Sequence, residues 1–302
     1  MLPPAPIPPR PSRGRALLSA MRVHQWVKNL LVFVPVVLDH QVLNGPVVLR
    51  ALGAFAAFSL AASGAYVLND LLDLESDRQH ETKRHRPFAS GVLPPRLALV
   101  LSPLLVGGAL LLAFGTLSRG FALMLAGYVA VTTAYSLRLK RYAVLDVLTL
   151  AGLYAWRVLA GVVATGVRFS TWLVAFSMFF FLSLAFLKRY GEVSRQGDDA
   201  PVASRRDYAR ADREWLGMMG GSSGYLSVLV LALYISSDEV MLLYQRPTVL
   251  WLVCPVLLYW ISRMWLLAYR GRVPEDPVVA AVRDPASYVA GAVVLAVLVA
   301  AS

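Results

Sequence analysis

Long apolar stretches separated by polar loops dominate the chain. Nine of them approach the roughly 20 residues that a helix needs to cross the hydrocarbon core of a bilayer. They run over residues 27–43, 47–68, 97–117, 121–135, 144–164, 172–187, 216–235, 249–267 and 287–300. The first, fourth and last are the shortest or least distinct. A helix satisfies its own backbone in lipid, and the alternating polar positions of a β-barrel are not seen, so we predict helices.

Composition agrees with this pattern. Of the 302 residues, 58% are hydrophobic and 16% are charged, and the mean hydropathy is +0.60, whereas soluble domains average about 25% charged residues. The sequence therefore predicts an all-α polytopic membrane protein. The single cysteine, Cys254, excludes an internal disulfide and is expected to serve core packing.

The amino-terminal segment differs from the rest. Six prolines and several arginines fall within residues 1–15, a composition that cannot bury a core. We therefore predict a disordered tail over residues 1–20 and a single transmembrane domain over residues 21–302. No small-residue cleavage site follows the first apolar run, so we do not expect a removable secretory signal.

The charge pattern predicts an orientation. The net charge is +11, which in a membrane protein is typical of basic cytoplasmic loops, so nucleic acid is not an expected partner. With the amino terminus in the cytoplasm, few basic residues fall outside: Arg50, Arg119, Arg168 and Arg246. Most acidic residues gather on the cytoplasmic face as well. The positive-inside bias does not require these acids, so both signs on one face indicate a site there.

The clearest candidate for chemistry is the segment that follows the second apolar stretch. Asp70, Asp73 and Asp77 are spaced i, i+3 and i+7 and share a face if the helix continues. Three carboxylates there repel one another unless a cation neutralises them. Carboxylate oxygens suit Mg²⁺, which binds one or two carboxylates together with substrate phosphates. The alternative is a solvated acidic helix end paired with nearby arginines.

Candidate phosphate-binding cations lie nearby and in two further cytoplasmic loops. Arginine grips phosphate bidentately and lysine acts as a point charge. The basic candidates are Lys83 and Arg86 after the acidic segment, Lys140 in the next cytoplasmic loop, and Lys188 and Arg189 at the end of the sixth stretch. Tyr135 precedes Lys140 and Asp146 follows it, and Glu192 follows Arg189. Ordinary basic loops and interface anchors would show the same residues. Arg157, in the middle of the fifth stretch, must face the bundle interior or water, and a structural ion pair would also satisfy it.

Two other features point to packing or to a loop. The glycines at 217, 220, 221 and 224 are typical of close helix packing rather than of a phosphate-binding loop, because no strand precedes them. The charged loop over residues 195–215 could be a lid over the site or a linker.

The motif Asn69-Asp70-x-x-Asp73-x-x-x-Asp77, followed by Lys83 and Arg86-Pro87, resembles the UbiA superfamily of intramembrane prenyltransferases. The resemblance runs from about residue 21 to the carboxyl terminus. It implies a helical bundle around a central cavity, a Mg²⁺-bound diphosphate donor, and a lipid chain that leaves the cavity sideways into the bilayer.

The chain departs from the aromatic-acceptor members of that superfamily. Where they carry a second aspartate-rich motif, this chain has Lys188-Arg189-Tyr190-Gly191-Glu192, with Asp198-Asp199 farther on. Together with Tyr135-Ser136-x-x-Leu139-Lys140 and Asp276-Pro277-Val278-Val279, this resembles the decaprenyl-phosphate phosphoribosyltransferase branch. That likeness implies transfer of 5-phosphoribose from phosphoribosyl diphosphate to a polyprenyl phosphate.

We accordingly assign roles to these residues. Asp70, Asp73 and Asp77 are expected to hold the metal with Asn69 assisting, and Lys83, Arg86, Lys140 and Lys188 to bind phosphates. Asp146 and Glu192 are expected to make a second metal contact or to hold ribose hydroxyls. Tyr135, Arg157 and Arg189 complete the predicted substrate-binding set.

The expected partners are a polyprenyl lipid, a diphosphate-bearing donor and the membrane, and a homo-oligomer is left open. The active site is expected to face the cytoplasm of a bacterial inner membrane. One alternative is transfer of an isoprenyl chain from a prenyl diphosphate to an aromatic or other ring acceptor. A transporter is a third hypothesis, but its charges would lie near the bilayer centre and its sequence would show internal repeats.

Overall fold

The computed structural model describes residues 12–79, 82–195, 207–272 and 277–302, and every regular element within these ranges is helical. Contacts divide the chain into two compact units that alternate along the sequence. The first unit comprises residues 1–30, 40–137 and 163–165, and the second comprises residues 31–39, 138–162 and 166–302. The expected single domain over residues 21–302 is thus divided between these two units, and its identity as one catalytic domain stays a prediction.

Part of the segment predicted to be a disordered tail is helical in the structure. Residues 1–11 lie outside the described residues, but helix α1 forms over Arg13–Ala20, so the prediction of disorder through residue 20 is wrong for this part. The proline-rich run ends before α1 begins. Ala16 and Ala20 are buried, and this burial stabilises a short helix that propensity alone would leave marginal.

Seven described helical segments are long and apolar enough to cross a membrane. They are α3 (Gly45–Leu72), α5 (Pro95–Thr116), α6 (Arg119–Leu137), α7 (Leu145–Thr165), α8 (Thr171–Ser194), Arg210–Ile235 and Pro247–Tyr269. Two shorter apolar segments, Val23–Leu38 and Pro285–Ala301, fall where the first and last stretches were predicted. The all-helical class and the positions of the spans agree with the sequence analysis. That the two short segments also cross the membrane, which would give nine spans, stays a prediction.

In the first unit, α3 packs against α5 and α6. The buried ring of Phe58 on α3 makes edge-to-face contacts with Phe121 and Tyr128 of α6. Gly64 brings α3 close to α5, because a Cβ atom at this position would lie 3.0 Å from the carbonyl oxygen of Ser102. The acidic segment leaves this packed layer at the end of α3 and continues into α4 (Leu74–Gln79) and the 3₁₀ turn η2 (Lys83–His85).

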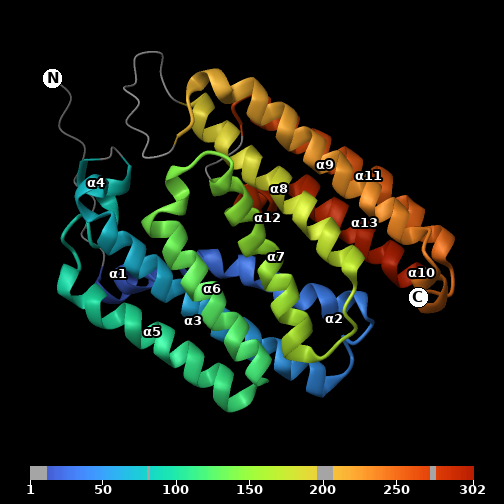
Figure 1. Ribbon diagram of the computed structural model, residues 1–302, viewed down its shortest axis with the longest axis horizontal. Helices are drawn as coiled ribbons and strands as arrows, with labels where there is room; N and C mark the ends of the chain where they lie inside the picture. Colours follow the sequence, from blue (N-terminus) through green and yellow to red (C-terminus); the bar gives the residue numbers. More distant parts are fainter. Residues whose placement is uncertain (1–11, 80–81, 196–206, 273–276) are drawn as a thin grey trace. The chain divides into compact units, whose positions relative to one another are not determined.

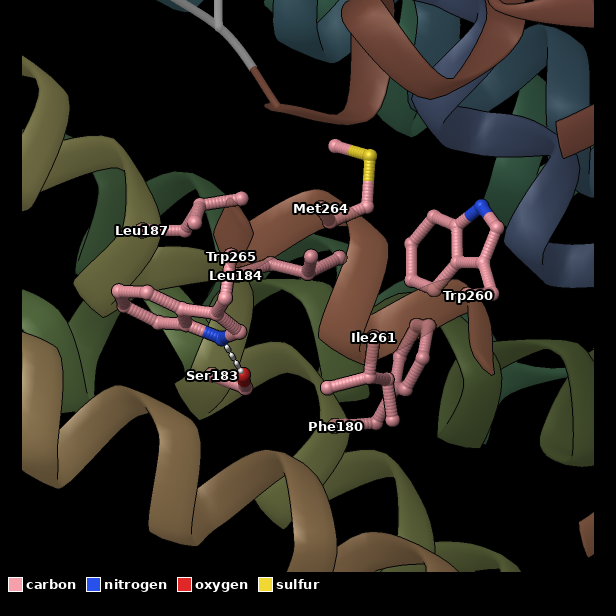
Figure 2. Close-up of a pocket in the computed structure, with 8 residues that line it drawn as sticks. All are labelled: Phe180, Ser183, Leu184, Leu187, Trp260, Ile261, Met264 and Trp265. Carbon is pink, nitrogen blue, oxygen red and sulfur yellow. Dashed lines mark hydrogen bonds between the residues drawn. The ribbon is translucent and has the colours of Figure 1, made fainter. Parts of the chain in front are cut away.

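In the second unit, α8 runs beside α9 (Arg213–Ile235), and α9 packs on α11 (Val253–Tyr269) (Figure 1). A Cβ atom on Gly220 would overlap the Trp265 ring, and one on Gly224 would lie 2.6 Å from Ile261. Figure 2 shows Trp265 donating its indole N–H to the Ser183 hydroxyl, a hydrogen bond of 3.0 Å. At Gly220 and Gly224 the predicted close helix packing is therefore confirmed.

The remaining elements of the second unit are short, apart from α13. They are α2 (Val34–Leu38), η3 (Leu139–Arg141), η4 (Arg210–Asp212), α10 (Asp238–Leu243), η5 (Pro247–Leu252), α12 (Pro277–Arg283) and α13 (Pro285–Ala301). Cys254 is buried in α11, which confirms its packing role. A cavity of about 400 Å³ lies among α8, α11, α12 and α13, lined mainly by apolar side chains, with Trp260 and Ser287 among them.

Candidate active site

The acidic segment of the first unit forms a buried cluster of opposite charges. Asp70, near the end of α3, and Asp77, in α4, are each 3% exposed. One nitrogen of Arg86, Nη1, lies 2.6 Å from an Asp77 oxygen and 3.2 Å from an Asp70 oxygen. Arg22 donates from Nη2 to the same Asp70 oxygen at 2.5 Å. The two carboxylates therefore converge on a single position that a cation occupies.

A break in the helix determines which acids meet. Helix α3 ends at Leu72, Asp73 caps it, and α4 begins at Leu74. The Asp77 N–H still donates to the Asp73 carbonyl at 2.8 Å, and the Asp77 carboxylate lies close to that of Asp70, with both in contact with Arg86. The Asp73 carboxylate instead accepts a hydrogen bond from the Asn69 amide at 3.2 Å. The structure thus brings Asp70 and Asp77 together through Arg86 and pairs Asp73 with Asn69.

The alternative of a solvated acidic helix end is only half right. The acids are paired with arginines, as that alternative requires, but Asp70 and Asp77 are buried rather than solvated. Burying charged groups is costly unless they are paired and hydrogen bonded. This buried set of charged side chains is therefore a candidate for function.

The donor set can be tested against Mg²⁺. No group of three or more His, Cys, Asp or Glu side chains suited to a metal ion occurs within the described residues. Two carboxylates nevertheless converge where the Arg86 nitrogen stands. Mg²⁺ commonly takes one or two carboxylates and completes its shell with water and substrate phosphates. The residues therefore fit Mg²⁺ bound together with a phosphorylated substrate.

Sequence reasoning missed Arg22. It lies just after α1 with a positive φ of 50°, and its guanidinium stands 4.9 Å from the centre of the Tyr66 ring. Nothing in its local sequence distinguishes it from the other basic residues near the amino terminus, because its partner Asp70 is 48 residues away. Lys83, predicted to bind phosphate, is half-buried in η2, three residues before Arg86.

The second unit carries its own buried charge cluster. Arg189 of α8 binds the Asp146 carboxylate of α7 with two nitrogens, at 2.5 Å and 2.9 Å. Its third nitrogen donates to Glu192 at 2.5 Å. Asp146 and Glu192, predicted to act together, are therefore brought to one place by Arg189. The guanidinium itself is 1% exposed, and all three of its nitrogens bind these carboxylates.

A tyrosine beyond the predicted set supports this cluster. The Tyr208 hydroxyl accepts a hydrogen bond from the Val144 N–H at 2.8 Å. Val144 has a φ of +64°, which is strained for a β-branched residue, and it caps the helix whose first turn carries Asp146. Burial is the main cause of a raised pKa for Tyr208, and the nearby Asp146 carboxylate raises it further, while the hydrogen bond from Val144 and the charge of Arg189 act to lower it. Tyr208 therefore stays neutral and holds the start of α7.

The other predicted residues lie apart from one another in the sequence and are placed as follows. Tyr135 belongs to the first unit and is half-buried near the end of α6. Lys140 and Lys188 belong to the second unit. Lys140 is buried in η3, and Lys188 is half-buried in α8. Arg157 is buried in α7, where it donates to the Leu153 carbonyl at 2.6 Å and stands over the Tyr154 ring.

Some predicted features lie outside the described residues. These are Asp198-Asp199, most of the 195–215 loop with its lid hypothesis, and Asp276. The end of that loop is described, and there Asp212 accepts a hydrogen bond from the Ala209 N–H at 2.8 Å. Arg213, next along the chain, stacks against the Tyr190 and Tyr269 rings.

Comparison with known proteins gives two kinds of relative. The UbiA prenyltransferase family matches residues 32–283. Over 93% of its length the chain is 38% identical to the uncharacterized protein y4nM of Sinorhizobium fredii, and it spans 55% of that protein. Over 90% of its length it is 38% identical to the nodulation protein NoeC of Azorhizobium caulinodans, of which it covers 88%.

A relative with a named reaction matches a shorter part. The chain is 38% identical, over 59% of its length, to the decaprenyl-phosphate phosphoribosyltransferase of Mycolicibacterium smegmatis, and the match covers 57% of that enzyme. Among solved structures, a UbiA homolog from Archaeoglobus fulgidus bound to GPP and Mg²⁺ has a similar fold. Its TM-score is 0.72 at 15% identity, over 95% of this chain and 99% of that one.

Proposed function

The chain belongs to the UbiA prenyltransferase family, and within that family we propose that it transfers 5-phosphoribose from phosphoribosyl diphosphate to a polyprenyl phosphate. The family makes it a membrane transferase that uses a diphosphate donor. In the proposed reaction, the bond between ribose C1 and a diphosphate oxygen breaks. A phosphate oxygen of the lipid forms the new bond to C1, and diphosphate leaves.

One observation carries the donor side of this proposal. Asp70 and Asp77 are buried and converge on the position of a single Arg86 nitrogen. A metal ion bound by these two acids would neutralise charge on the departing diphosphate. We assign Asp70 and Asp77 as its holders, with Asp73 and Asn69 beside them. That Asp73 joins them at the ion, as the sequence predicts, is part of the same proposal.

The arginines of this cluster have a second role. Arg22 and Arg86 lie at the carboxylates, and both have donors in the geometry that grips phosphate oxygens. In the proposed enzyme they bind the diphosphate when the donor enters, with Lys83 as a further point charge. Fixed cations at a site shielded from water stabilise a departing anion more strongly than the same charges in solution.

The phosphoribosyl donor and phosphate acceptor are supported by the mycobacterial relative and by the second charge cluster. Arg189 stands where aromatic-acceptor members carry acids, and it fixes Asp146 and Glu192. We propose that these carboxylates accept hydrogen bonds from the ribose hydroxyls. Lys140 and Lys188 are proposed to bind phosphate, with Tyr135 and Arg157 as further substrate contacts.

The lipid substrate requires an apolar binding surface. The cavity of about 400 Å³ among α8, α11, α12 and α13 is lined by side chains such as Leu257 and Val294, and we propose that it takes part of the isoprenoid chain. The charge asymmetry of the loops supports an active site on the cytoplasmic face of a bacterial inner membrane. A homo-oligomer is compatible with this proposal.

The alternative reaction is prenyl transfer to an aromatic or other ring acceptor, which the family description favours. One assay separates the two. Purified protein is given labelled phosphoribosyl diphosphate with decaprenyl phosphate, and in parallel labelled geranyl diphosphate with an aromatic acid. We expect label in the lipid fraction of the first mixture and no product in the second. Product only in the second mixture would establish prenyl transfer instead.

A further inference from the structure

A polar seam runs from the acidic cluster into the apolar part of the first unit. Asn29 donates to Ser59 at 3.1 Å, and Trp26 donates to Ser63 at 3.0 Å. Ser59 and Ser63 lie on the same face of α3 as Asp70, at i, i+4 and i+11. Eleven helical residues separate Ser59 from Asp70, which is about 16 Å along the axis, or roughly half of the hydrocarbon core.

The partner of α3 in this seam has unusual backbone geometry. It is η1, a 3₁₀ helix that covers Val23–Phe33. Runs of this kind longer than 3–4 residues are uncommon, and they frequently mark a functional or strained segment. Side chains three residues apart eclipse each other in a 3₁₀ helix. Gln25 and Lys28 therefore share one face of η1. Trp26 and Asn29 share the adjacent face, from which they donate hydrogen bonds to α3.

Lys28 is the informative residue on the face that it shares with Gln25. It is 7% exposed and lies within the apolar segment Val23–Leu38. Ionisable side chains within membrane segments are rare and mark substrate or ion sites. Beside it, the side-chain oxygen of Gln25 is buried and accepts no hydrogen bond from any described residue. Turned over, the same amide would direct its N–H donors to a ligand oxygen.

We infer that Lys28 and Gln25 form a second phosphate-binding site, separate from the diphosphate site at Asp70 and Asp77. The inference rests on the proposed function, whose reaction brings two further phosphate groups to the enzyme. One is the phosphate of the lipid acceptor, and the other is the 5-phosphate of the donor. Both are phosphomonoesters, and a lysine with an amide donor beside it suits either of them.

Steady-state kinetics of the full-length protein tests this site. Lys28→Met keeps the length of the side chain and removes its charge. We expect it to raise KM at least tenfold for either decaprenyl phosphate or phosphoribosyl diphosphate, and the substrate affected identifies which phosphate binds. Lys28→Arg should leave KM close to that of the wild type, with a change well below the roughly threefold rise expected for Gln25→Leu below, because the charge remains. The exposed Arg50 provides the control, Arg50→Met. Unchanged KM for both substrates in Lys28→Met would overturn the inference.

A binding experiment separates failure of this site from failure of the proposed reaction. Thermal unfolding is measured with farnesyl phosphate and with ribose 5-phosphate, and with farnesol and ribose as phosphate-free controls. One phosphorylated probe should raise the Tm of the wild type more than its control does, and Lys28→Met should lose that difference. This result supports the site even if no phosphoribosyl transfer is found. Equal effects of phosphorylated and control probes on the wild type would overturn it.

If Lys28→Met does not yield folded protein, Gln25→Leu provides the second variant. It removes the amide and leaves the lysine in place. We expect KM for the same substrate to rise about threefold, with the KM of the other substrate unchanged. The inference would be overturned if Gln25→Leu had the same KM values as the wild type while Lys28→Arg also behaved as the wild type.

Discussion

Arg189 holds Asp146 with two guanidinium nitrogens, at 2.5 Å and 2.9 Å, and each of these side chains is 1% exposed. The two residues come from neighbouring helices, α8 and α7. The same guanidinium also binds Glu192. Arg189, a member of the predicted substrate-binding set, therefore holds two carboxylates in the structure, and its role in substrate binding stays a prediction.

Removing one partner of this pair should destabilise the protein. Arg189→Met leaves the Asp146 carboxylate buried without its cation, which costs about 3–5 kcal/mol in comparable pairs. The double variant Arg189→Met/Asp146→Leu removes both charges and should recover much of the loss. Thermal unfolding of the purified variants measures both effects. A double variant that is less stable than Arg189→Met would contradict a role for the pair as a unit.

Asp73 should be needed for turnover but not for folding. It is half-exposed beyond the end of α3 and accepts a hydrogen bond from Asn69, so Asp73→Ala buries no unpaired charge. We expect a loss of at least 100-fold in kcat/KM with an unchanged Tm. Glu75, two residues on and exposed, supplies the control Glu75→Gln. If Asp73→Ala were as active as Glu75→Gln, Asp73 would have no place at the metal site.

Two adjacent glycines in α9 should respond in opposite ways. A methyl group at Gly220 would meet the Trp265 ring and Phe186, whereas one at Gly221 meets nothing within 4 Å. Gly220→Ala should destabilise the protein by about 1–3 kcal/mol through overpacking. Gly221→Ala should leave the stability unchanged or raise it by up to about 1 kcal/mol, because alanine has the higher helix propensity. Similar Tm values for the two variants would refute the close packing of α9 on α11.

Asp284 should contribute to the acid sensitivity of the fold. Partial burial acts to raise its pKa, but hydrogen bonds from Arg263 and Ser287 outweigh burial and hold the pKa below its ordinary value. The stabilising contribution of Asp284 is therefore fully present above about pH 4, the unfolded pKa, and is lost as the pH falls through the folded pKa. Asp284→Asn should flatten the fall of Tm below pH 4. A variant that follows the wild-type curve there would show that this pair has no such role.

The spans could be predicted because each depends on a local property. A run of apolar side chains about as long as a bilayer crossing can be recognised in the sequence without knowing which other helices it packs against. The ends were harder to predict, because α1 depends on the burial of Ala16 and Ala20 by the rest of the unit. The 3₁₀ geometry of η1 was not predicted, since its apolar pattern is the same as that of an α-helix.

The acidic cluster was predicted in part. The spacing of Asp70, Asp73 and Asp77 was readable, but it assumed a continuous helix. The chain breaks at Asp73, so Asp70 and Asp77 meet at Arg86 while Asp73 pairs with Asn69. Long-range partners leave no local signal either: Asp146 and Arg189 are 43 residues apart. Their pairing follows from tertiary packing, which the pattern of a single sequence does not reveal.

The central claim is that the acids of the first unit hold a divalent ion together with a diphosphate. Electron paramagnetic resonance of Mn²⁺, used in place of Mg²⁺, tests this without relying on turnover. We predict that phosphoribosyl diphosphate increases the amount of protein-bound Mn²⁺, that Asp77→Asn abolishes the increase, and that Glu75→Gln preserves it. Equal binding of Mn²⁺ by the wild type and Asp77→Asn in the presence of the diphosphate would contradict the claim.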